Sequence, residues 1–272
     1  MAGIAIIGFR EALEASLVIG IMLGYLSKTG QPSHLRRWVW MGVWTAILAS
    51  TVVAYLFKTF TGGFEGRGEQ LFEGSIMLLT VALISYTVIW MQKQARGVAA
   101  RVRAKTDRAI GTDAAQTGWG LAGLAFASVV REGVEAVLFL EAAWVAGGSA
   151  GDWLAFILGI AAAVALAVAA SSSTARLDLR RFFKVSGLLL VLFGGGLLAH
   201  GIHEFQEAGV LPVVVEHVWD LGKYLSDERG LGQLLRALFG YSSAPSLLEV
   251  IAWITFVFFA GRSYLKTGSG NP

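Results

Sequence analysis

Two short sets of charged residues interrupt long apolar stretches of this chain. Each has the pattern Arg-Glu-x-x-Glu; the first is Arg10-Glu11-Ala12-Leu13-Glu14 and the second is Arg131-Glu132-Gly133-Val134-Glu135. On a helix, the two glutamates of one set lie on the same face, about 4.5 Å apart along the axis. Carboxylate oxygens without thiolates suit hard cations such as Mg²⁺, Ca²⁺, Mn²⁺ or ferric iron, with ferrous iron a borderline case. We therefore interpret the four glutamates as ligands of one shared cation site, with Arg10 and Arg131 holding them by bidentate hydrogen bonds.

Internal pairing is the alternative interpretation of these residues. The arginine and the second glutamate of each set have the i, i+4 spacing of helical ion pairs. That pairing leaves Glu11 and Glu132 uncompensated, and six unpaired ionisable residues inside apolar spans would cost roughly 15–20 kcal/mol together. Four carboxylates and two guanidiniums carry a net charge of −2, so a multivalent cation brings the site close to neutrality.

The composition predicts that the scaffold of this site is an all-α, polytopic membrane protein. The 272 residues are 55% hydrophobic and 15% charged, with a mean hydropathy of +0.63, whereas soluble domains carry about 25% charged residues. Apolar runs of about twenty residues predict seven transmembrane helices in a single permease domain over 1–272. The predicted spans are 3–26, 38–57, 72–91, 119–142, 153–172, 184–203 and 246–265. The absence of cysteine excludes disulfides and thiolate ligands.

The distribution of basic residues predicts the orientation. Fifteen of the 22 Lys and Arg residues fall in the first, third and fifth connections and the C-terminal segment, and five fall on the opposite side. By the positive-inside rule, the N-terminus is outside and the C-terminus is cytoplasmic, which agrees with an odd number of spans. The basic residues therefore follow the membrane topology, and they need no nucleic-acid partner.

The position of the two sets predicts an inverted repeat. They lie on the first and fourth spans, and this odd offset makes the two halves enter the membrane in opposite directions. Inverted repeats of this kind place the substrate site of many secondary transporters near the bilayer midplane. We expect one repeat over about 3–91, a second over about 119–203, an outer loop over about 204–245, and an additional helix over about 246–265.

Five further residues are weaker candidates for metal binding. Glu141 lies two turns beyond the second set and could relay a cation. Glu73 opens the third span, where metal binding and capping of a helix N-terminus are both open interpretations. His203, Glu204 and Glu207 have the spacing i, i+1 and i+4 at the end of the sixth span and suggest an outer metal-loading point, with a structural histidine as the alternative.

Three other segments carry local expectations. The polar, basic segment 92–118 is expected to be a solvated hairpin. Gly194-Gly195-Gly196 indicates either close helix packing or a broken helix beside the site. Four leucines at helical spacing predict a short surface helix in the outer loop, with a packed loop as the alternative; they are Leu231, Leu234, Leu235 and Leu238.

These motifs resemble the oxidase-dependent iron permease family, which includes fungal iron permeases and the bacterial Efe-type permease. The family's hallmark is Arg-Glu-x-x-Glu on the first and fourth spans. Further likenesses are Leu71-Phe72-Glu73-Gly74, the stretch from His203 to Gly209, and the stretch from Gly240 to Ser246. The resemblance covers essentially the whole chain. It implies an iron permease of the plasma or inner membrane, with iron as substrate, no cofactor, and a separate oxidase or periplasmic iron-binding proteins as partners.

Two other functions compete with iron import. Another cation carrier, or a proton-coupled exporter, could use the same scaffold. An intramembrane enzyme could use paired carboxylates for acid–base chemistry. The sequence contains no Ser-His-Asp set, no His-Glu-x-x-His zinc motif and no phosphate loop. We therefore expect a transporter and not an enzyme.

Overall fold

The computed structural model describes residues 2–61, 65–94, 98–110, 114–147, 150–172, 179–227 and 230–268. These residues form helices joined by turns and loops, with no strand among them. The helices are α1 (Ala2–Lys28), α2 (Leu35–Thr61), α3 (Arg67–Gln94), α4 (Val98–Ala109), α5 (Ala114–Val145), α6 (Ala150–Ser172), α7 (Leu179–Glu207), α8 (Gly230–Phe239) and α9 (Leu247–Gly268). The all-α prediction is confirmed for the described part of the chain.

Within the described residues, five helices are long and apolar enough to cross a membrane, namely α2, α3, α6, α7 and α9. The chain is therefore a multi-pass membrane protein. The two helices that carry the Arg-Glu-x-x-Glu sets are also long, with 27 residues in α1 and 32 in α5. Their charged residues set them apart from the other five.

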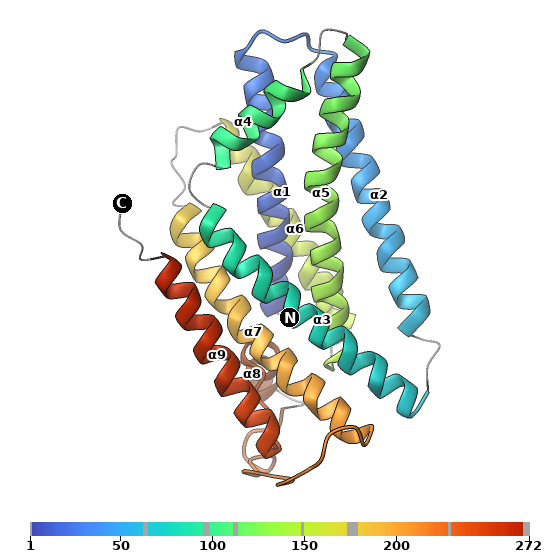
Figure 1. The fold of residues 1–272 in the computed structure, drawn as a ribbon, viewed down its shortest axis with the longest axis vertical. Helices are drawn as coiled ribbons and strands as arrows, with labels where there is room; N and C mark the ends of the chain where they lie inside the picture. The colour runs from blue at the N-terminus through green and yellow to red at the C-terminus, as the bar shows by residue number, and fades with distance from the viewer. Residues whose placement is uncertain are drawn as a thin grey trace.

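The two helices that carry the sets run antiparallel through the middle of the bundle (Figure 1). One hydrophobic cluster joins the C-terminal half of α1, including Met22 and Leu26, to Leu121 near the start of α5. Another joins Ile4, at the start of α1, to Leu140 near the end of α5. These opposite pairings fix the direction of the two helices relative to each other.

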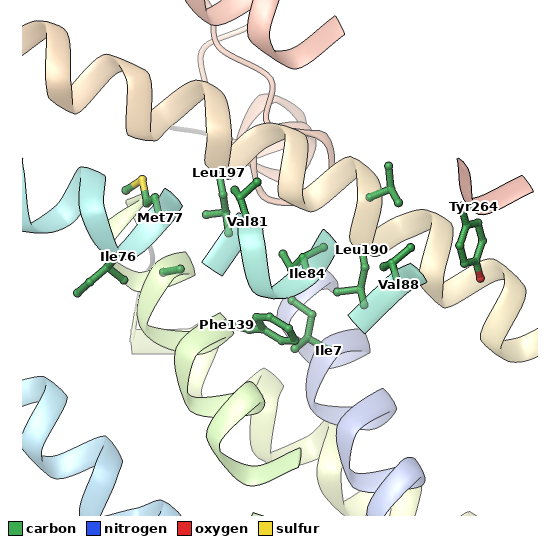
Figure 2. Close-up of a cluster of buried hydrophobic side chains, with 12 residues drawn as sticks. Ile7, Ile76, Met77, Val81, Ile84, Val88, Phe139, Leu190, Leu197 and Tyr264 are labelled. Atoms are coloured by element: carbon green, nitrogen blue, oxygen red, sulfur yellow. The ribbon is translucent and has the colours of Figure 1, made fainter. Parts of the chain in front are cut away.

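The remaining long helices pack around this central pair, and α2 and α6 each pack on the central helix that is farther away in the sequence. The extensive contacts are those of α1 with α6, of α2 with α5, of α3 with α7, and of α7 with α9. Figure 2 shows the largest hydrophobic cluster, in which Ile7, Ile84, Phe139 and Leu190 come together from α1, α3, α5 and α7. This cluster joins the α3–α7–α9 group to the central pair of helices.

Glycines allow α2 to approach α5 closely and α6 to approach α1 closely. A Cβ atom added at Gly42 of α2 would collide with the carbonyl oxygen of Ala122 on α5. A Cβ atom added at Gly159 of α6 would likewise collide with the carbonyl oxygen of Ala5 on α1. In each half of the chain, a glycine of the second long helix therefore seats that helix against the central helix of the other half.

The segment expected to be a solvated hairpin contains helix α4 instead. Residues Val102 and Thr106 lie one turn apart and are buried, because α4 packs on α1 and α5. The hydroxyl of Tyr25 on α1 donates a hydrogen bond of 3.0 Å to Asp107. The hairpin prediction is therefore wrong for residues 98–109, where the helix buries one narrow stripe and exposes its charges.

Two other local expectations are settled by helices α7 and α8. Helix α7 continues through Gly194-Gly195-Gly196, so this stretch is not a broken helix. A Cβ atom at Gly196 would collide with the backbone of Gly240, which follows α8; the glycines therefore serve close packing. The outer loop contains a helix, α8, as predicted, and not merely a packed loop. This helix packs on α7 and α1, and its expected position on the membrane surface stays a prediction.

Candidate metal site

The two Arg-Glu-x-x-Glu sets meet where α1 and α5 cross. Carboxylate oxygens of Glu11, Glu132 and Glu135 all lie within 4.8 Å of one another. Glu11 and Glu135 are 2% and 4% exposed, and Glu132 is half-buried. Two carboxylates of one helix and one of the other therefore face a common point inside the bundle. Such a point favours a cation because the three negative charges otherwise repel one another.

Both arginines contact carboxylates of their own helix. Arg10, which is 1% exposed, pairs with Glu11 and also places Nη2 at 2.8 Å from Oε1 of Glu14. Arg131 Nε donates to Oε1 of Glu135 at 3.0 Å. The i, i+4 pairs considered as the alternative are thus present. They coexist with the gathering of three carboxylates and do not replace it.

The gathered carboxylates keep free acceptor atoms. Oε2 of Glu11 and Oε2 of Glu132 are buried and have no hydrogen-bond partner within the described residues. A buried carboxylate oxygen without a partner loses its hydration and gains nothing in return. Three oxygens at most 4.8 Å apart fit within a circle of radius about 2.8 Å, so a point exists that is no farther than this from all three. This limit is close to the 2.0–2.6 Å from metal to oxygen of hard divalent cations. A small inward movement of the side chains would bring all three oxygens within bonding distance of one ion.

A threonine of a third helix also reaches the site. The hydroxyl of Thr87 on α3, which is 1% exposed, donates a hydrogen bond of 3.0 Å to Oε2 of Glu135. Thr87 was not among the predicted site residues. Threonines in helices commonly bond to the carbonyl oxygen of the preceding turn, so nothing in the sequence distinguishes Thr87 from its neighbours.

A glycine within the second set brings α5 close to α2. A Cβ atom added at Gly133 would collide with the Oγ atom of Ser50 on α2. Ser50 is itself buried. The glycine therefore permits the close contact of α5 with α2 next to Glu132.

The weaker candidates at the end of α7 lie in a separate group. His203 Nε2 is 3.2 Å from Oε1 of Glu207, and its Nδ1 is 3.1 Å from Oε1 of Glu249 on α9. Glu204 lies 3.7 Å from His200 Nε2. These side chains pair with one another, and they are not part of the group of three carboxylates.

Glu73 and Glu141 lie apart from the central site. Glu73, on α3, is close enough to Glu204 and Glu69 to interact with them electrostatically, so it joins the group at the end of α7. Glu141 is 3% exposed near the end of α5, within electrostatic range of Lys58 on α2. Their part in metal binding stays a prediction.

The helical bundle and its buried carboxylates define a membrane protein with a polar site between its spans, as expected of a transporter of small ions. Residues 1–263 match the model of the iron permease FTR1 family. The chain belongs to this family.

The chain is similar along most of its length to curated bacterial proteins. It is 33% identical over 252 residues to the "Ferrous iron permease EfeU" of Yersinia pestis, covering 93% of this chain and 89% of the relative. It is 33% identical over 257 residues to the protein of that name from Escherichia coli O6:K15:H31, covering 93% and 91%. The same values hold for the protein from Shigella sonnei. No solved structure matches the chain.

Proposed function

We propose that this protein imports iron through a site formed by Glu11, Glu14, Glu132 and Glu135. The observation that carries the proposal is the group of three carboxylate oxygens from α1 and α5. Membership of the iron permease family identifies iron as the cation to test first. The relatives named for ferrous iron make that oxidation state the first substrate.

The charges of the site suit a dehydrated multivalent cation. The four glutamates and two arginines of the sets carry a net charge of −2. A ferrous ion that enters exchanges water for the free oxygens of Glu11 and Glu132, and Glu135 completes the three-carboxylate group. Glu14 stays beside Arg10, where it limits the positive charge that the ion meets. The carboxylates thus replace the hydration of the ion, and the arginines keep them in place.

The packing supports an inverted repeat of three helices, with α9 as an additional seventh span. The first repeat contains α1, α2 and α3, and the second contains α5, α6 and α7. In this repeat α1 corresponds to α5, and α2 corresponds to α6. The contact of α1 with α6 should therefore have a counterpart between α5 and α2, and both contacts are extensive. Gly42 and Gly159 have matching roles at these contacts. The proposal places the cation site near the middle of the bilayer, between the repeats.

The proposed topology puts the N-terminus outside and the C-terminus in the cytoplasm of a plasma or inner membrane. The group of His203, Glu204 and Glu207 then lies on the outer side, where it would load iron toward the centre. A separate periplasmic iron-binding protein would deliver the ion there. A separate oxidase acting before uptake would make the delivered ion ferric, so the partner and the oxidation state are tested together. The whole chain acts as a single permease domain.

Uptake of radioactive iron by proteoliposomes tests the proposal. Glu11→Ala, Glu14→Ala, Glu132→Ala and Glu135→Ala should each abolish uptake while the protein remains folded in the membrane. Glu216→Ala, which changes an exposed loop carboxylate, is the control and should transport like the wild type. Normal uptake by any two of the four site variants would count against the site. Competition by Mn, Zn and Pb separates an iron importer from another cation carrier.

A further inference from the structure

One carboxylate of the site is held on both of its oxygens. Oε1 of Glu135 accepts from Arg131 Nε at 3.0 Å, and Oε2 accepts from the hydroxyl of Thr87, also at 3.0 Å. In contrast, Glu11 and Glu132 each retain a buried oxygen without a hydrogen-bond partner within the described residues. Glu135 therefore has a fixed orientation, whereas each of the other two carboxylates has an oxygen available for the ion.

We propose that Thr87 is a positioning residue for iron, which sets the orientation of Glu135 from a third helix. This inference rests on the proposed function of the same site. The hydroxyl holds Oε2 of Glu135 at a defined place in the three-carboxylate group, so the ion meets that carboxylate already oriented. Preorganised ligands bind more tightly because less conformational freedom is lost on binding.

A second buried threonine on the same helix differs from Thr87 in the acceptor of its hydroxyl proton. Thr80 lies seven residues earlier on α3, on nearly the same face, and is 0% exposed. Its hydroxyl donates to the carbonyl oxygen of Ile76 at 2.8 Å, within its own helix. Ser85 bonds in the same way to Val81. Thr87 instead donates its single proton across to α5, where the carboxylate is a stronger acceptor than a carbonyl.

The contact also joins the site to a helix that carries no Arg-Glu-x-x-Glu set. Helix α3 packs along α7, and α7 packs along α9. Val88, next to Thr87, belongs to the hydrophobic cluster that includes Leu190 of α7 and Tyr264 of α9. The orientation of Glu135 therefore depends on where the α3–α7–α9 group sits against α5. A shift of that group would release one oxygen of the carboxylate.

Three substitutions separate the hydroxyl from the rest of the side chain. Thr87→Val removes the hydroxyl and keeps the shape, Thr87→Ser keeps the hydroxyl, and Thr80→Val is the matched control on the same face. Ferrous iron is titrated into the purified protein, and initial uptake is measured over a range of iron concentrations. Thr87→Val should raise the dissociation constant and the half-saturating concentration about tenfold. Thr87→Ser should stay within about twofold of the wild type, as should Thr80→Val.

A double-mutant cycle with Glu135→Ala, which removes both acceptor oxygens, tests whether Thr87 acts through that carboxylate. Thr87→Val should add little to the defect of Glu135→Ala, whereas it should add its full effect to that of Glu132→Gln. Wild-type affinity in Thr87→Val, or an equal loss in Thr80→Val, would overturn the inference. If Thr87→Val does not fold, the iron affinities of Thr87→Ser and Thr87→Ala are compared instead. Weaker binding in Thr87→Ala supports the inference, and equal affinities overturn it. Unchanged iron binding in Glu135→Ala would instead refute the proposed function itself.

Discussion

Replacing Glu132 with glutamine should move iron affinity and protein stability in opposite directions. Oε2 of Glu132 is buried without a hydrogen-bond partner in the described part of the chain, and its carboxylate faces those of Glu11 and Glu135. In the absence of iron, this charge destabilises the fold. In the presence of iron, it is a ligand. A residue kept only for the fold would not show this combination.

The structure sets the size of both effects. At about 2.8 Å, the limit set by the 4.8 Å spacing of the oxygens, a unit charge attracts a divalent ion by about 12 kcal/mol at an effective dielectric constant of 20. Much of this is offset by dehydration of the ion, and loss of one partner of a buried charge pair costs about 3–5 kcal/mol in practice. Glu132→Gln should therefore weaken iron binding by a factor of about 10²–10⁴. Removal of the uncompensated charge should stabilise the iron-free protein by about 1–3 kcal/mol.

Calorimetric titration with ferrous iron and thermal unfolding, both in lipid nanodiscs, measure the two quantities. The variant should unfold at a higher temperature than the wild type without iron, and iron should raise that temperature less than it does for the wild type. Glu216→Gln, at an exposed loop position, should match the wild type in both measurements. Wild-type iron affinity in Glu132→Gln would refute the assignment of this carboxylate as a ligand.

Three further predictions concern the scaffold of the site. Arg10→Lys should lower stability and iron uptake more than Arg131→Lys. An ammonium cannot contact Glu11 and Glu14 as the planar guanidinium does, and the side chain of Arg131 is 32% exposed against 1% for Arg10. Thermal unfolding and iron uptake measure the two effects, and equal effects of the two substitutions would contradict the prediction. Gly133→Ala should reduce the yield of folded protein by forcing α5 away from α2, and adding Ser50→Gly should restore part of that yield. Size-exclusion chromatography measures the yield, and a normal yield for Gly133→Ala would show that the two helices can separate freely. The chain has no cysteine, so a single introduced cysteine reports the side of the membrane on which it lies. Ser33→Cys, on the proposed cytoplasmic side, should react with an impermeant thiol reagent only after the cells are opened, whereas Glu216→Cys, in the outer loop, should react in intact cells. The reverse pattern would show that the proposed orientation is inverted.

The long helices could be predicted because their apolar runs are strong local signals. Each predicted span overlaps one helix, and the boundaries differ by a few residues. Helix α4 was missed because its buried stripe contains Val102 and Thr106 among basic residues. So little apolar surface does not distinguish a packed helix from a solvated segment until the neighbouring helices are known.

The carboxylates of the candidate site could be named from the sequence, but their arrangement could not be predicted. The pattern Arg-Glu-x-x-Glu indicated four carboxylates. Which of them come together depends on the rotation of α1 and α5 about their axes, which places Glu14 beside Arg10 and turns Glu11 toward the other helix. Thr87 was beyond prediction for the same reason, because only the packing of α3 on α5 directs its hydroxyl to Glu135.

The location of bound iron tests the central claim most directly. A structure of the protein with ferrous iron, examined at the iron absorption edge, should show an anomalous peak between Glu11, Glu132 and Glu135. The peak should disappear in Glu132→Gln and persist in Glu216→Gln. Iron found solely at the group of His203, Glu204 and Glu207, with the central carboxylates left without it at saturating concentration, would contradict the account.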